Sequence, residues 1–251
     1  MGHSRAEKEK THKRIVKIAA RRFREEGLAA VGIAELMKEA GLTVGGFYKH
    51  FDSRDDLVAE ALSSAFGGWK RRVDAAASGG PPVSLAKLID DYLNAAHRDD
   101  PGTGCAFSAL APEIACSDKR TRALATEQVR NDIQLIAGLI PRRDAHAARS
   151  QAILTFSALV GALSLARAVS DEALSREILK TVAELLKNLA SPQRVVNRPK
   201  SFRSVANGWT SPGVRHEKVE AAIPNCRCPL SQQQCTRGKM FQLRARGLVP
   251  N

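Results

Sequence analysis

A short run of polar and aromatic residues, 43–50, carries the groups in this chain that are best suited to contact nucleic acid. The hydroxyl groups of Thr43 and Tyr48 can hydrogen-bond to phosphate, and Lys49 adds a positive charge. Such contacts position a protein on a duplex without reading its sequence, so base discrimination must come from side chains that reach base edges. The candidate DNA contacts are Thr43, Val44, Gly45, Gly46, Tyr48, Lys49, His50 and Arg54.

The residues at the start of the run, where base edges would be contacted, have apolar or no side chains. Val44, Gly45 and Gly46 offer no side-chain hydrogen-bond donors, although Val44 could contact a thymine methyl group. The two glycines would let the backbone approach the DNA closely, at a helix-propensity cost of roughly 1 kcal/mol each relative to Ala. We therefore expect sequence recognition to depend partly on DNA shape.

This run forms the third of three predicted helices. Apolar residues at helical spacing predict a helix over 8–26 that ends at Gly27, and a second over 33–40 that ends at Gly41. Thr43 stands where a helix cap is needed, and a third helix over 44–50 would be anchored by Phe47 and Phe51. This pattern predicts a helix-turn-helix.

The rest of the chain also shows helical periodicity up to about residue 190. Ser53 and Asp56 open a fourth helix that is expected to continue to the breaker cluster at 78–82. Further helical patterns cover 85–96, 129–140, 144–169 and 171–189, with a short apolar segment at 105–115. No long strand alternation occurs, so we expect an all-α fold. The predicted parts are a DNA-binding domain (1–66), a helical ligand-binding and dimerisation domain (67–190) and a disordered tail (191–251).

Charge and apolar runs along the chain indicate which partners and which cellular compartment to expect. The formal net charge is +13, but residues 191–251 alone carry 11 basic and two acidic groups. Residues 1–24 carry nine Lys or Arg against Glu7 and Glu9, so the leading helix is locally basic. No run of 18 apolar residues and no signal-peptide core are found, which favours a cytoplasmic protein with reduced thiols and no membrane partner.

The chain resembles TetR-family transcriptional regulators in its first 65 residues or so, and beyond them only through an all-helical layout of suitable length. The residues that carry the resemblance are Gly27, Ala40-Gly41-Leu42-Thr43, Gly46-Phe47-Tyr48-Lys49-His50-Phe51 and Ser53-Arg54-Asp55-Asp56-Leu57. The resemblance implies a homodimeric repressor that binds a palindromic DNA operator and is released by a small-molecule effector. Many relatives carry Lys or Arg where this chain has Val44. The family often has a phosphate-binding Lys at position 54, but Arg54 could equally be an exposed first-turn residue.

The resemblance also makes the segment 105–115 part of a ligand pocket. Apolar residues with Glu113 as a lone charge suit a mostly apolar cavity. The candidate pocket residues are Cys105, Phe107, Leu110, Glu113 and Phe156. At the start of a helix the Cys105 thiol pKa would be lowered, which resembles the placement of a sensing cysteine in members that respond to electrophiles. The alternative, a small buried side chain, is the commoner fate of such a cysteine, and Cys116 is expected to be a packing residue.

Other functions are less well supported by the residues. No set of nucleophile, base and orienting group accompanies Cys105, so we expect no enzymatic activity, no catalytic residues and no cofactor. Cys226, Cys228 and Cys235 are a weak zinc signal, and no metal site is predicted. In the helix 144–169, the small residues Ser157, Gly161, Ser164 and Ala168 would permit close approach of another helix. With the next helix, whose apolar face is Leu174, Ile178, Val182, Leu185 and Leu189, this predicts half of a four-helix dimer interface.

Overall fold

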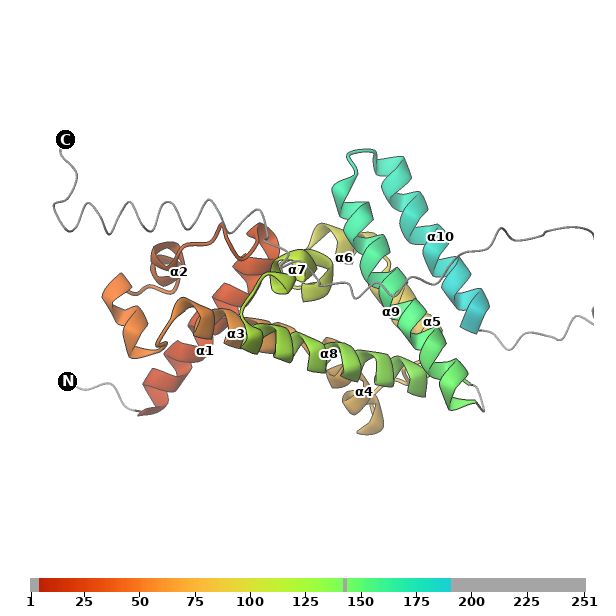
Figure 1. The fold of residues 1–251 in the computed structure, drawn as a ribbon, viewed down its shortest axis with the longest axis horizontal. Helices are drawn as coiled ribbons and strands as arrows, with labels where there is room; N and C mark the ends of the chain where they lie inside the picture. The colour runs from red at the N-terminus through yellow and green to blue at the C-terminus, as the bar shows by residue number, and fades with distance from the viewer. Residues whose placement is uncertain (1–4, 142–143, 191–251) are drawn as a thin grey trace, which may run out of the picture. The chain divides into compact units, whose positions relative to one another are not determined.

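The computed structural model describes residues 5–141 and 144–190, and every regular element in these ranges is helical (Figure 1). The prediction of an all-α fold is confirmed. The described residues belong to one compact unit. The elements are α1 (Arg5–Glu26), α2 (Ile33–Glu39), the 3₁₀ helix η1 (Val44–Lys49), α3 (Arg54–Ala65), α4 (Gly68–Ala77), α5 (Leu85–Tyr92), α6 (Ala95–Asp99), α7 (Ala106–Ala115), α8 (Lys119–Gly138), α9 (Ala145–Ala168) and α10 (Glu172–Ala190).

The N-terminal helices form as the sequence predicts, apart from the conformation of the third. α1 buries one apolar stripe that includes Ile15, Ala19 and Phe23, and it packs against α2 and α3. η1 is a 3₁₀ helix where the sequence predicts an ordinary α-helical turn. Adjacent Gly45 and Gly46 have low α-helix propensity, and a short 3₁₀ segment is a common alternative.

Two predicted long helices are interrupted in the structure. The helix that begins after Ser53 ends at Ala65, because Phe66 is extended and Gly67 has a φ of 75° that favours glycine. The helical pattern over 85–96 is divided between α5 and α6. Asn94 caps α6 by accepting a hydrogen bond from the backbone N–H of His97 at 2.9 Å. Both breaks place side chains into the cavity described below.

The C-terminal helices pack around α9. Figure 1 shows α9 and α10 side by side, and α9 also contacts α8 and α7. By length and composition α9 is apolar enough to cross a membrane. Its Leu159 and Leu163 are fully buried, as in the central helix of a helical core. The apolar face predicted for α10 is only partly buried: Ile178 and Val182 pack against the core, whereas Leu174, Leu185 and Leu189 are exposed. The fully buried residues of α10 lie beside this face and include Leu179, Ala183 and Leu186.

The predicted domain boundary near residue 66 coincides with the end of α3, but the apolar core continues across it. The ring of Phe66 stacks on that of Phe107 in α7, with centroids 5.1 Å apart. The division at residue 66 therefore stays a prediction. The predicted disordered tail, 191–251, and its cysteines Cys226, Cys228 and Cys235 lie outside the described residues.

Candidate nucleic-acid interface and ligand cavity

The η1 segment is anchored to the core on one side and exposed to solvent on the other. Phe47 is fully buried and its ring lies 5.3 Å from that of Phe51. The backbone N–H of Gly46 donates to the carbonyl of Thr43 at 2.9 Å, which closes the first turn. Tyr48 is 70% exposed, Val44 is 49% exposed, and Thr43, Gly45 and Lys49 are also exposed. The segment thus presents hydroxyl groups, a cation and bare backbone on one accessible surface.

The two glycines of η1 are not required by the packing of the protein itself. A Cβ atom built on Gly45 would have nothing within 4 Å, and one on Gly46 would meet Met37 Cε at an ordinary 3.6 Å. Neither has a positive φ. Room for a side chain therefore exists at both positions on the protein side, and close approach of DNA to this backbone remains a prediction.

Arg54 is directed into the protein, which argues against the expected phosphate contact. Its Nη2 donates to the carbonyl of Leu28 and, at 3.2 Å, to that of Val31. Its guanidinium also lies 5.7 Å from the centre of the Phe23 ring. Arg54 therefore joins α3 to the turn between α1 and α2. The competing expectation, an exposed first-turn residue, also fails because the side chain is half-buried.

His50 is half-buried at the edge of the exposed segment. Burial lowers its pKa, and the neighbouring charges of His12, Lys8 and Lys49 lower it further. His12 itself hydrogen-bonds Glu60 at 2.6 Å and stacks on Phe51 at 4.6 Å. The positive side chains of α1 predicted to face DNA, Arg5, Lys8, Lys10, Lys13 and Arg14, are all exposed. Lys13 forms an ion pair with Glu9 at 2.7 Å.

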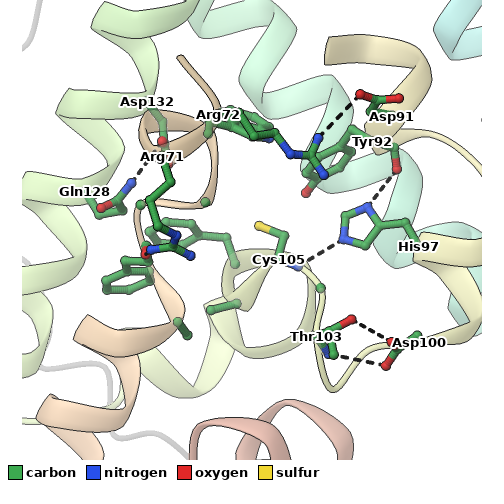
Figure 2. A pocket seen from close by; sticks show the side chains of 18 of the residues that line it. Arg71, Arg72, Asp91, Tyr92, His97, Asp100, Thr103, Cys105, Gln128 and Asp132 are labelled. Carbon is green, nitrogen blue, oxygen red and sulfur yellow. Dashed lines mark hydrogen bonds and ion pairs between the residues drawn. The ribbon is translucent and has the colours of Figure 1, made fainter. Parts of the chain in front are cut away.

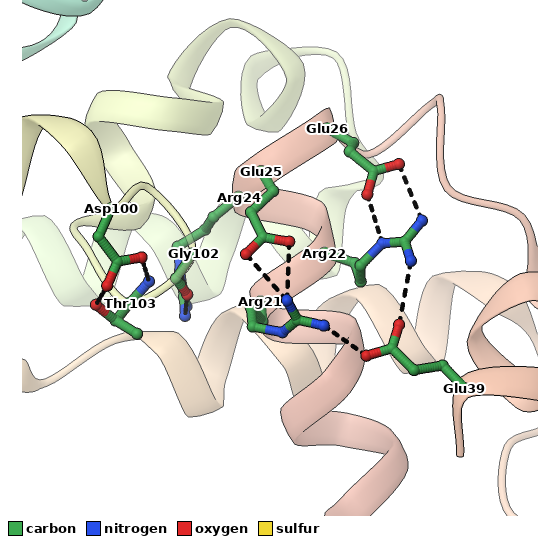
Figure 3. Close-up of polar contacts among 9 residues, drawn as sticks. All are labelled: Arg21, Arg22, Arg24, Glu25, Glu26, Glu39, Asp100, Gly102 and Thr103. Carbon is green, nitrogen blue, oxygen red and sulfur yellow. Dashed lines mark hydrogen bonds and ion pairs between the residues drawn. The ribbon is translucent and has the colours of Figure 1, made fainter. Parts of the chain in front are cut away.

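Ion pairs join α1 to α2. Figure 3 shows Arg21 and Arg22 of α1 both reaching Glu39 at the end of α2, with Nη–Oε distances of 2.5 and 3.1 Å. Glu25 and Glu26 engage the same arginines from α1. Because the carboxylate of Glu39 is shared between two guanidinium groups, α2 and the turn that follows it are tied to α1.

A cavity of about 430 Å³ lies among the C-terminal helices (Figure 2). Five aromatic residues contribute to its wall: Phe66, Trp69, Tyr92, Phe107 and Phe156. The ring of Phe156 contacts two of the others: its centroid lies 5.9 Å from that of Trp69 and 5.8 Å from that of Phe107. A volume of this size suits a drug-sized organic molecule.

The predicted pocket residues divide into two groups. Cys105, Phe107 and Phe156 line the cavity, whereas Leu110 and Glu113 do not. Leu110 is a buried core residue. Glu113 faces the N-terminal helices: its Oε2 accepts a hydrogen bond from the backbone N–H of Ala29 at 3.1 Å. The expectation that Glu113 is the charged group of the pocket is therefore corrected.

Cys105 occupies the predicted position, immediately before α7 and in the cavity wall. Its backbone N–H donates to Nε2 of His97 at 3.0 Å. The other ring nitrogen of His97, Nδ1, donates to the carbonyl of Tyr92 at 2.8 Å, so the ring is neutral with its proton on Nδ1. Burial lowers the His97 pKa, in agreement with this state. Cys116, expected to be a packing residue, is exposed at the end of α7.

The most buried polar groups of the cavity, Asp132 and Tyr92, are not among the pocket residues predicted from the sequence. Asp132 of α8 is 8% exposed and lines the wall, and burial raises its pKa to about 6. It accepts a hydrogen bond from Nε2 of Gln128 at 2.9 Å. The hydroxyl of Tyr92 is buried and has no hydrogen-bond partner within the described ranges. A carboxylate one turn after an amide is a common helix-surface pattern, so only the packing of α8 reveals the role of Asp132.

The segment from α6 to α7 touches both the cavity and the N-terminal helices. Gly104 and Cys105 line the cavity, and the carbonyl of Gly102 accepts a hydrogen bond from Nε of Arg24 in α1 at 2.9 Å. At the other end of α7, Glu113 lies against Gly27, where an added Cβ would come within 2.8 Å of Oε1. A shift of α7 would therefore alter two contacts with the N-terminal region, one through Gly102 and one through Glu113.

Comparisons with known proteins agree with this arrangement. The family model described as bacterial regulatory proteins, tetR family, matches residues 15–61. The uncharacterised HTH-type transcriptional regulator YerO of Bacillus subtilis is 32% identical over 77 residues, which are 30% of this chain and 27% of that protein. The HTH-type transcriptional regulator AcrR of Shigella flexneri is 33% identical over 57 residues, 23% of this chain and 26% of AcrR. The chain thus spans about a quarter of the length of these relatives.

Solved structures share the fold over a longer stretch. The reduced form of NemR from E. coli superposes with a TM-score of 0.60 and 18% identity, covering 74% of this chain and all of NemR. A TetR-family regulator from Cytophaga hutchinsonii gives a TM-score of 0.61 and 18% identity over 77% of this chain and all of that one. At these identities the comparison concerns the fold, including the helices that surround the cavity.

Proposed function

Because this chain belongs to the TetR family of bacterial regulatory proteins, we propose that it is a transcriptional regulator whose residues 1–66 bind double-stranded DNA. The observation that carries the proposal is the exposed face of η1, held by buried Phe47 directly after the Gly41 turn. A segment of this length fits the major groove. The basic face of α1 adds charge that strengthens attraction to the duplex.

The proposed contacts differ in kind. Thr43 and Tyr48 bond phosphate oxygens, and Lys49 neutralises a phosphate. Val44 contacts a thymine methyl group, and Gly45 and Gly46 bring the backbone close to the base edges. His50, which is half-buried, supports the segment and reaches the DNA only at its edge. Arg54 takes no part, because its guanidinium is used within the protein.

We further propose that the protein acts as a homodimer on a palindromic operator. Large apolar side chains are exposed along α9 and α10, namely Ile153, Leu154, Leu165, Leu174, Leu185 and Leu189. The small residues Ser157 and Ala168 are exposed on α9 as well, and Gly161 is half-buried. A second copy packed on this face would bury these side chains and form a four-helix interface. Two-fold symmetry would then supply two DNA-binding units at a fixed spacing.

The cavity is the proposed effector site, and the protein is proposed to be a cytoplasmic repressor released by its ligand. Occupancy changes the position of α7, because Cys105 and Phe107 lie in the cavity wall. The contacts of Arg24 with Gly102 and of Glu113 with Ala29 carry this shift to the DNA-binding helices. A change in the spacing of the two DNA-binding units would then weaken operator binding.

The cheapest test is a gel shift with the DNA upstream of the coding sequence of this protein. We expect a complex that survives competition by unrelated DNA at moderate salt, with the stoichiometry of a dimer on one site. If unrelated DNA competes equally well, the test is repeated with a second fragment taken from the adjacent genes. Equal competition on both fragments would refute the proposal of a sequence-preferring regulator.

A second candidate function is electrophile or redox sensing through Cys105. The observation in its favour is that the cysteine lies in the cavity wall rather than in the sealed core. Measurement of the thiol pKa by pH-dependent alkylation, with Cys105→Ser as control, tests it. A pKa near that of an ordinary thiol, together with an unchanged effector response of the variant, would leave Cys105 a packing residue.

A further inference from the structure

Asp132 is a buried carboxylate for which the described residues provide no cationic partner. It is 8% exposed, and among the described residues it accepts a hydrogen bond from the neutral amide of Gln128. None of the ion pairs among the described residues includes it. A buried carboxylate that lacks a positive partner costs stability, and burial raises its pKa to about 6. A buried carboxylate in a cavity wall is a candidate binding group, because a cationic ligand can supply the positive charge that the protein does not.

The neighbouring wall has the chemistry that attracts cations. Trp69, Phe107 and Phe156 form a connected set of rings, with Trp69 edge-on to Phe156 and Phe156 edge-on to Phe107. Tyr92 adds a further ring, 5.4 Å from Trp69, and a buried hydroxyl. Faces of aromatic rings carry partial negative charge and bind organic cations, most strongly when water is excluded.

The two arginine side chains of the cavity wall have partners other than Asp132. Arg72 pairs with Asp91 at 3.6 Å, and Nη1 of Arg71 donates to the carbonyl of Phe66 at 2.9 Å. Arg71 and Arg72 are both exposed residues of α4, and Figure 2 shows their guanidinium groups pointing to separate places in the cavity wall. Neither forms an ion pair with Asp132, so the carboxylate in the interior is not neutralised by them.

We propose that the cavity binds an organic cation, an ammonium group attached to an aromatic or similarly apolar body, with the charge placed against Asp132 and the body among the aromatic rings. The inference rests on the proposed role of this cavity as the effector site. The volume of about 430 Å³ admits one drug-sized molecule. The Tyr92 hydroxyl offers a hydrogen bond to a polar substituent of the same ligand.

Three probes that share a phenyl ring on a short alkyl chain and differ in the charge of the polar end test the proposal: 4-phenylbutylamine, 4-phenylbutanol and 4-phenylbutanoate. Binding to the full chain without DNA is measured by calorimetry at pH 7.5. Quenching of Trp69 fluorescence locates the probe, in a Trp209→Phe background because the other tryptophan lies outside the described residues. We expect the amine to bind roughly 10- to 100-fold more tightly than the alcohol, and the carboxylate more weakly than both.

Matched variants identify the group responsible. Asp132→Asn should reduce the amine to the affinity of the alcohol, whereas Glu127→Gln, at an exposed carboxylate of the same helix, should leave the preference intact. The proposal would be overturned if the three probes bound equally, if the carboxylate bound most tightly, or if no probe bound. It would also be overturned if the two variants had equal effects. Because no DNA is present, amine binding by a protein that fails the gel shift would refute the proposed function and leave this inference standing.

Discussion

Replacement of Asp132 by Asn should stabilise the protein, and the gain should depend on pH. In the folded chain the carboxyl pKa is about 6, against an ordinary value of 3.8. Between about pH 4 and pH 6 the folded chain therefore holds a proton that the unfolded chain has released. The free energy of unfolding must then fall as pH rises through this window, and stay level above it.

The size of the effect follows from the shift. About two pKa units at about 1.4 kcal/mol each give a cost of roughly 3 kcal/mol above pH 7 for the wild-type carboxylate. An Asn at position 132 does not titrate, and its Oδ1 can still accept the hydrogen bond from Gln128. We therefore expect Asp132→Asn to be more stable than the wild type by up to about 3 kcal/mol at pH 7.5 and by about 1 kcal/mol at pH 4.5.

Urea denaturation followed by circular dichroism at pH 4.5, 6.0 and 7.5 measures these differences. Glu127→Gln serves as the control, because it removes an exposed carboxylate from the same helix and should show no comparable trend. A stability difference that does not change with pH would mean that Asp132 titrates normally in the folded protein. A variant less stable than the wild type at pH 7.5 would mean that the carboxylate has a stabilising partner, and the reasoning about the cavity would fail.

Three further variants test the remaining structural assignments. Gly45→Ala should leave the free energy of unfolding unchanged or raise it by up to about 1 kcal/mol, because the added Cβ has open space; urea denaturation measures this. The same variant should weaken DNA binding, measured by fluorescence anisotropy, if the backbone approaches the duplex. Arg54→Ala should lower the free energy of unfolding by about 1–3 kcal/mol, because the carbonyls of Leu28 and Val31 lose their donor, and leave the salt dependence of DNA binding unchanged. The pair Leu165→Glu and Leu185→Glu should convert the dimer to a folded monomer in sedimentation experiments, and a dimer that persists would place the interface elsewhere.

The sequence was informative wherever one apolar period persisted over several turns. The bounds of α1, α2 and α9 agree with the predicted ranges to within a few residues, because each buries one stripe of regularly spaced side chains. The break at Gly67 was missed because Leu57, Ala61 and Leu62 fit a helix that continues, and only the left-handed φ of Gly67 ends it. The apolar face predicted for α10 is present, but the structure buries the adjacent residues more deeply, and of the predicted face only Ile178 and Val182 pack against the core.

The candidate sites divide in the same way. The exposed residues of η1 could be identified because Gly41, Phe47 and Phe51 fix their local frame. The partners of Arg54 and Glu113 could not, because Arg54 bonds carbonyls 23 and 26 residues away and Glu113 bonds an N–H 84 residues away. Long-range pairing of this kind leaves no periodic trace in a single sequence, and each side chain alone looked equally suited to a surface or a pocket.

The most direct test of the central claim, that η1 docks on DNA, is the salt dependence of DNA binding by Lys49→Ala. Lys70→Ala is the matched control, since Lys70 is an exposed lysine of α4, paired with Asp74 and outside the proposed interface. In fluorescence anisotropy against the logarithm of salt concentration, the slope for Lys49→Ala should fall by about one on both operator and random DNA, and the slope for Lys70→Ala should not change. An unchanged slope for Lys49→Ala would contradict the proposed docking, and a loss confined to operator DNA would mean that Lys49 reads bases instead of phosphate.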